Sequence, residues 1–229
     1  MKNSISKILH LITFFVAMAM LESAVVIYLR ELLYPNGFQF PMVSMHPIVI
    51  LTELTREFAT IVMLWTISYV AGRNFSTRFA WFLIGFAIWD IFYYVFLYIF
   101  IDWPATIWDW DILFLIPLPW YGPVVAPCLI SFSMILLGAI ILYIDFRNKT
   151  IIWRSNTLIL MTIGCIISLW TFMGDFVRTM PWSQQIKISE QIITHSSHYI
   201  PTNYNYLAFG MAMLAILAGI FLFYKDNIK

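Results

Sequence analysis

The stretch LTELTREFATIVMLW, residues 51–65, decides how often the chain crosses a membrane. Most of its residues suit a membrane helix, yet it carries Glu53, Arg56 and Glu57. A charged side chain at the centre of a bilayer costs about 2.5–3.5 kcal/mol on insertion scales, so such residues usually face the interior of a helix bundle. Glu53, Arg56 and Glu57 lie within about 100° of helical arc. The stretch therefore predicts a membrane helix with one polar face.

The composition places the whole chain in a bilayer. Of its 229 residues, 62% are hydrophobic and only 11% are charged, which leaves too little polar surface for a soluble domain of this size. The net charge is +1, and the 13 lysines and arginines are scattered singly. Because binding to phosphates needs a basic face, nucleic acid is excluded as a partner, and the lipid bilayer is the predicted one.

Six apolar runs are long enough to cross about 30 Å of hydrocarbon, which takes about 20 helical residues. They cover residues 8–33, 47–71, 79–100, 123–144, 155–174 and 204–224. The predicted fold is all-α: a polytopic integral membrane protein with a six-transmembrane-helix bundle in a single membrane domain, 1–229. Two outer segments, 101–122 and 175–203, complete it, and the first is an aromatic-rich interfacial or re-entrant loop.

Positive charges fix the predicted orientation. If the N-terminus is cytoplasmic, nine of the 13 lysines and arginines fall on that side of the membrane: Lys2, Lys7, Arg73, Arg78, Arg147, Lys149, Arg154, Lys225 and Lys229. Inner segments of membrane proteins carry such an excess of basic residues. Both termini are therefore expected in the cytoplasm.

Three acidic residues on different helices are expected at the same depth. At about 1.5 Å per helical residue, Glu22, Glu57 and Asp90 each lie roughly 12–17 Å from the outer ends of their helices. Together with Glu53 and Arg56 they form the predicted catalytic group. Equal depth does not fix helix rotation, so their convergence is an inference.

Acids outnumber arginines in this region. Two arginines, Arg30 and Arg56, face five acids: Glu22, Glu31, Glu53, Glu57 and Asp90. Surplus acids must be protonated, bind a cation or meet a partner's charge, which favours a functional site. The alternative is structural: Arg56 neutralises one glutamate and Arg30 another, and these buried pairs only fix the register of the helices.

The outer segment IDWPATIWDWDILFLIPLPWYGP, residues 101–123, holds four tryptophans, four prolines and three aspartates. Its apolar part is too short to span, and tryptophan prefers the membrane interface. The segment is predicted to cover the polar site and to contact substrate through Trp103, Trp108, Asp109, Trp110, Asp111 and Trp120. The alternative is an aromatic belt that anchors the protein at the headgroups.

Histidines on the outer side suggest a metal site. The sequence HSSH places His195 and His198 three residues apart, on one side of a helix. Imidazole and carboxylate groups suit iron, copper or zinc. A transition metal is therefore a candidate cofactor, with Glu22, Glu57, Asp90, His195 and His198 as candidate ligands. The competing interpretation is that HSSH is ordinary polar loop.

These observations predict a membrane-embedded oxidoreductase that uses a metal or protons and acts on a lipid or quinone-like substrate. Two other classes stay open. One is a small proton- or cation-coupled transporter that uses the same acids. The other is a non-catalytic subunit of a larger membrane complex, whose charges pair with helices of other subunits.

Overall fold

The computed structural model describes residues 2–182 and 187–228, and most of these residues are helical. The elements within these two ranges are α1 (Lys2–Leu33), α2 (Pro47–Ala71), α3 (Phe75–Ile101), β1 (Trp110–Phe114), β2 (Trp120–Pro123), α4 (Val125–Phe146), α5 (Ser155–Thr179), α6 (Ile188–Ser196) and α7 (Tyr206–Ile228). The helical class predicted from the sequence is confirmed.

Within the described ranges, five helices are long and apolar enough to cross a membrane: α1, α3, α4, α5 and α7. This indicates an integral membrane protein in a lipid bilayer. α2 has the length of a span but is not one of the five, and it is the helix that carries Glu53, Arg56 and Glu57.

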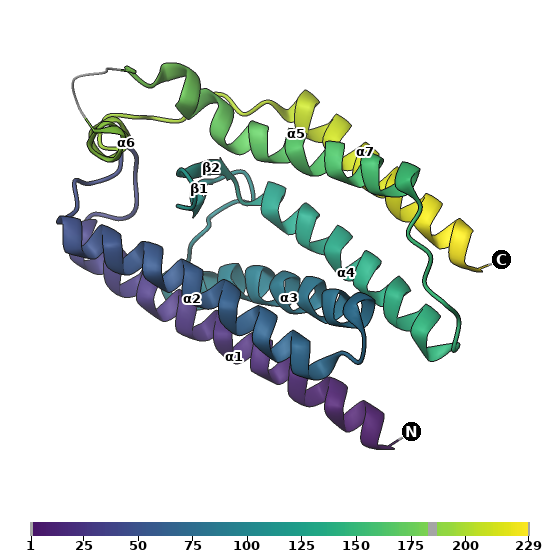
Figure 1. The fold of residues 1–229 in the computed structure, drawn as a ribbon. Helices are drawn as coiled ribbons and strands as arrows, with labels where there is room; N and C mark the ends of the chain where they lie inside the picture. Colours follow the sequence, from purple (N-terminus) through teal and green to yellow (C-terminus); the bar gives the residue numbers. More distant parts are fainter. Residues whose placement is uncertain (1, 183–186, 229) are drawn as a thin grey trace.

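The long helices run alongside one another in two groups (Figure 1). α3 packs against α1, α2 and α4, while α5 packs chiefly against α7. The strands β1 and β2 lie between the groups, toward the end of the molecule that carries α6. Both chain termini lie toward the opposite end.

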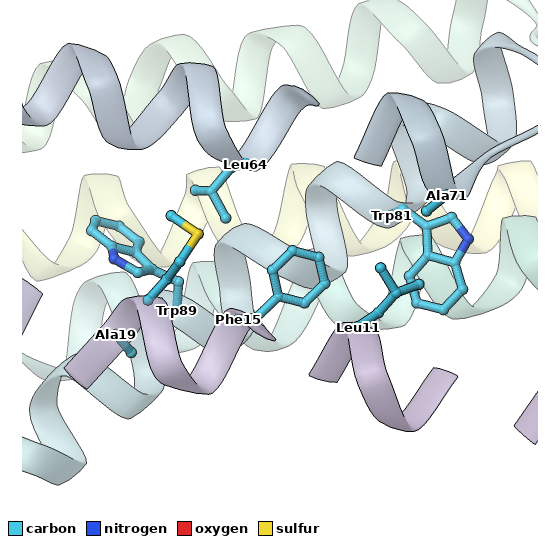
Figure 2. Close-up of a cluster of buried hydrophobic side chains, with 8 residues drawn as sticks. Leu11, Phe15, Ala19, Leu64, Ala71, Trp81 and Trp89 are labelled. Atoms are coloured by element: carbon cyan, nitrogen blue, oxygen red, sulfur yellow. The ribbon is translucent and has the colours of Figure 1, made fainter. Parts of the chain in front are cut away.

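A cluster of buried apolar side chains joins α1, α2 and α3 (Figure 2). At its centre, the side chain of Phe15 is fully buried. A Cβ atom on Gly85 of α3 would come within 2.4 Å of the Phe15 ring. Small residues let membrane helices approach closely, so Gly85 makes the space in which Phe15 packs.

The starts of α2 and α3 follow from local sequence. Pro47 occupies the first turn of α2, where a missing N–H costs nothing, and His46 accepts a hydrogen bond from the Ile48 N–H. Asn74 and Thr77 form a reciprocal capping box at the start of α3. These caps set where the two helices begin and keep the connection between α2 and α3 short.

Residues 101–122 are not a simple interfacial loop, because part of the segment folds into an antiparallel hairpin of β1 and β2. Asp111 is paired with Gly122, and Ile112 with Tyr121. The two strands satisfy part of each other's backbone N–H and C=O groups, and non-helical chain is tolerated at membrane depth where it is buried in protein. The hairpin can therefore enter the bundle, and the side chains of Asp111 and Tyr121 are almost fully buried.

Candidate functional site

Arg56 on α2 is the centre of a charged cluster. Its Nε and Nη2 atoms donate to Oε2 of Glu53 at 2.9 and 2.7 Å, and its guanidinium also forms an ion pair with Glu22 on α1. The Thr60 hydroxyl donates to Oε2 of Glu22 at 3.3 Å. The structural alternative, in which Arg56 neutralises a glutamate, therefore describes a real contact, but the single guanidinium is shared by two carboxylates.

Glu57 connects this cluster to the hairpin of β1 and β2. The main-chain N–H of Leu115, in the turn between β1 and β2, donates to both carboxylate oxygens of Glu57, at N···O distances of 3.0 and 2.9 Å. Glu57 is buried, with 6% of its surface exposed. A main-chain donor compensates part of its charge, but it is not a cation, so the Arg56 cluster keeps a surplus of acid.

A second buried arginine has a partner of its own. Arg30, near the end of α1, donates through Nη2 to Oδ1 of Asp111 on β1 at 3.0 Å. Its guanidinium carbon also lies 4.4 Å from the centre of the Phe38 ring and 3.8 Å from that of Trp103. Arg30 therefore pairs with an aspartate 81 residues away, and the expectation that it neutralises a glutamate is wrong.

The two arginines border the same cavity, which has a volume of about 110 Å³. Its polar lining consists of Arg30, Glu53, Arg56, Glu57, Tyr93 and Asp111. Tyr34 also borders it, and burial raises the pKa of this phenol above its usual range. The cavity thus brings together charges from α1, α2 and the hairpin, with acids in excess over arginines.

An apolar pocket of about 170 Å³ adjoins the charged cavity. Three residues line both spaces: Met42, Met45 and Leu115. The remaining walls of the apolar pocket come from the start of α2, the prolines of the hairpin turn and α6. A molecule with a polar end and an apolar end would find complementary surfaces in these two spaces.

Asp90 lies apart from this cavity. Its Oδ2 accepts a hydrogen bond from the Ser131 hydroxyl on α4 at 2.8 Å, and it does not line the charged cavity. Glu22, Glu57 and Asp90 therefore point to three different partners, although the sequence placed them at one depth. The rotation of α3, which depth does not determine, turns Asp90 toward α4.

The outer histidines have local partners. Nε2 of His195 lies 3.1 Å from the Thr179 hydroxyl, and Nδ1 of His198 lies 2.8 Å from the Thr194 carbonyl oxygen. Burial lowers the pKa of His195 below its usual value. Among residues 2–182 and 187–228, no three His, Cys, Asp or Glu side chains lie where they could hold a metal ion. The predicted metal set gains no support from this arrangement.

The residues predicted to contact substrate from the aromatic segment have two different environments. Asp111 and Trp103 contact Arg30 beside the cavity. The others contact neighbouring helices or their own loop: Trp108 packs against Tyr206, Trp110 against Tyr204 and Trp120 against Phe172, and Asp109 accepts hydrogen bonds from Ala105 and Thr106. For Asp111 and Trp103, a role in covering the polar site stays a prediction. The contacts of the other four residues anchor the hairpin and its flanking loop.

Three participants were absent from the predicted site, namely Arg30, Tyr93 and the Leu115 N–H, and the sequence also did not predict Ser131, the partner of Asp90 outside the cavity. Arg30 was visible in the sequence as an ionisable residue at the end of a membrane helix. Tyr93 and Ser131 carried no signal, because hydroxyl groups are common in membrane helices. A main-chain donor such as the Leu115 N–H leaves no trace in side-chain identity.

Comparison with protein-family models, curated proteins and solved structures gives no match to this chain. No activity can therefore be transferred from a relative. The function has to be argued from the charged cavity, the apolar pocket beside it and the helices that carry them.

Proposed function

We propose that the protein binds a lipid-like amphipathic molecule, whose polar head enters the charged cavity and whose apolar part lies in the adjoining pocket. The observation that carries this proposal is that Met42, Met45 and Leu115 line both spaces, so the charged cavity and the apolar pocket are neighbours. Binding sites for such molecules are mostly apolar, with a few polar groups that orient the ligand. Here the charged side chains gather at one end and the apolar walls at the other.

The cavity also supports a chemical role for the bound head group. Glu53 and Glu57 are buried carboxyl groups beside a guanidinium, and both line the cavity. Such groups can take up or release protons at a bound molecule. A proton-using enzyme acting on a lipid or quinone-like substrate is consistent with this arrangement. The oxidoreductase part of the sequence prediction has no added support and stays a prediction.

The test is to identify molecules that co-purify with the protein in mild detergent, by mass spectrometry of extracts. Met45→Trp would narrow both spaces, because Met45 lines each of them, so we expect the bound amphipathic molecule to be lost. Val62→Trp is the matched control, because Val62 is an exposed residue of α2 and lines neither space. Equal retention of the same molecule in Met45→Trp and the wild type would contradict the proposal.

A second candidate function, ion-coupled transport, is favoured by one observation. Among the residues that the structure describes, Arg56 is the only arginine that pairs with Glu22 and Glu53, and Glu57 adds a third acid beside it. Intramembrane acids without a full complement of cations are typical of coupling sites. Uptake into sealed proteoliposomes driven by a pH gradient would test this, and a flux that is unchanged in Glu57→Gln would count against it.

We further propose that α2 is a sixth span and that both termini face the cytoplasm. The support is the number of basic residues at the chain ends and in the connections on that side. Reporters fused to the two termini test the even number of crossings, because five spans would place the termini on opposite sides. A bilayer-facing α2 requires its charges to point inward, as the Glu22–Arg56 ion pair allows.

A further inference from the structure

One nitrogen of Arg30 lacks a partner. Arg30 is 8% exposed, its Nη2 donates to Asp111, and its Nη1 is buried without a hydrogen-bond partner among the described residues. A buried donor left unpaired costs free energy, and guanidinium nitrogens are good donors to phosphate and carboxylate oxygens. Because Arg30 lines the charged cavity, an anionic group of a bound molecule would satisfy this nitrogen.

The acids of the same cavity favour a positive charge on the bound molecule. Glu53 and Glu57 both line it, and Arg56, which pairs with Glu53, is shared with Glu22, while Arg30 pairs with Asp111. A ligand that brings a positive charge would balance this surplus. An ammonium group has three donors and can contact more than one carboxylate, so it suits a space bordered by two glutamates.

The apolar pocket shares three lining residues with this cavity and is bordered by methionines, prolines and α6. Methionine side chains adapt to irregular apolar shapes, which suits a hydrocarbon chain. The polar requirements and the apolar pocket together describe a molecule with an anion, an ammonium group and a hydrocarbon part.

We infer that the ligand is a zwitterionic membrane lipid of the phosphoethanolamine class, with its phosphate against Arg30 and its ammonium group against Glu53 and Glu57. This inference rests on the proposed function, because it assigns the head group of the amphipathic molecule proposed there. The apolar pocket of about 170 Å³ has room for the first part of one hydrocarbon chain, which is why a membrane lipid is chosen over a soluble zwitterion.

The experiment uses the full chain in nanodiscs that contain equal amounts of phosphatidylethanolamine and phosphatidylglycerol. The lipids that stay bound after extraction are counted by native mass spectrometry. In the wild type we expect phosphatidylethanolamine to be retained about tenfold over phosphatidylglycerol, the ratio that one charge-assisted hydrogen bond supports. Glu57→Gln should reduce this preference to near unity, while Glu31→Gln, an exposed acid on α1, should leave it unchanged.

A second variant tests the role of Arg30 without leaving a buried charge that could prevent folding. Arg30 and Asp111 are changed together to Gln and Asn, so that no charge is left buried without its partner. This variant should lose retention of both phospholipids by about tenfold, because each carries the phosphate that contacts Arg30.

The outcomes separate the inference from the proposed function. Equal retention of the two phospholipids, with loss of both in Met45→Trp, would overturn the zwitterionic head group and leave the amphipathic site standing. Absence of any retained lipid in the wild type would overturn the proposed function itself. Displacement of bound lipid by soluble glycerophosphoethanolamine at equal concentration would overturn the role given to the hydrocarbon chains.

Discussion

The two arginines of the cavity have different electrostatic surroundings. Arg30 has one acid, Asp111, and its guanidinium is packed against two aromatic rings. Arg56 is shared by Glu22 and Glu53, with Glu57 nearby. A one-to-one buried pair is balanced and mainly holds the hairpin on α1. The cluster around Arg56 keeps spare acid, which is the condition for binding a cation or exchanging a proton.

The largest effect is expected for Arg30→Gln, because it leaves Asp111 charged and buried without a cation. Breaking a buried pair on one side costs about 3–5 kcal/mol of stability. Unfolding in detergent should show this loss, and the double change Arg30→Gln with Asp111→Asn should recover most of it. If the double variant were as unstable as the two single changes added together, the pair would not be the balanced unit described above.

Arg56→Gln should destabilise the protein less, by about 2–3 kcal/mol, because its side chain is 20% exposed and partly screened. Its acids can also escape the loss by taking up protons. The deficit should therefore shrink between pH 8 and pH 5, since protonated carboxyl groups need no cation. A deficit that is independent of pH would show that the cluster behaves like the balanced pair.

Trp103→Leu removes one of the rings beside the Arg30 guanidinium. A desolvated cation–π contact contributes up to about 2 kcal/mol, so a loss of about 1–2 kcal/mol is expected on thermal unfolding. Trp108→Leu is the control, because Trp108 is exposed and lies against Tyr206 instead. Equal losses in the two variants would argue against a special role of the ring at Arg30.

Glu57→Gln should have the smallest effect on stability, below about 1 kcal/mol, because the new amide oxygen can still accept from the Leu115 N–H. Its effect on ligand binding or ion-coupled flux should be much larger. Glu57→Gln should thus reduce binding or flux more than stability. Arg30→Gln should do the opposite and reduce stability most. A large loss of stability in Glu57→Gln would show that Glu57, like the Arg30–Asp111 pair, mainly stabilises the fold.

The sequence predicted the helices well, because long apolar runs, Pro47 and the basic connections are local signals. It also predicted that Glu22, Glu53, Arg56 and Glu57 matter as charged groups in an apolar setting. The hairpin was missed, because β1 and β2 are only five and four residues long and the apolar stretch ILFLIP shows no alternation of apolar and polar residues. The partner of Asp90 was missed because helix rotation is set by packing, which spacing alone does not encode.

The Arg30–Asp111 pair has a consequence for the order of synthesis. The ribosome makes Arg30 in the first helix, while its partner on β1 follows only after α2 and α3 have been made. Until then the nascent chain holds an unpaired arginine, and Glu57 waits for the same segment to supply the Leu115 N–H. The arrival of the hairpin thus completes two contacts at once. A chain that stops after α3 would keep both groups uncompensated, which is the kind of feature by which cells recognise unfinished membrane proteins.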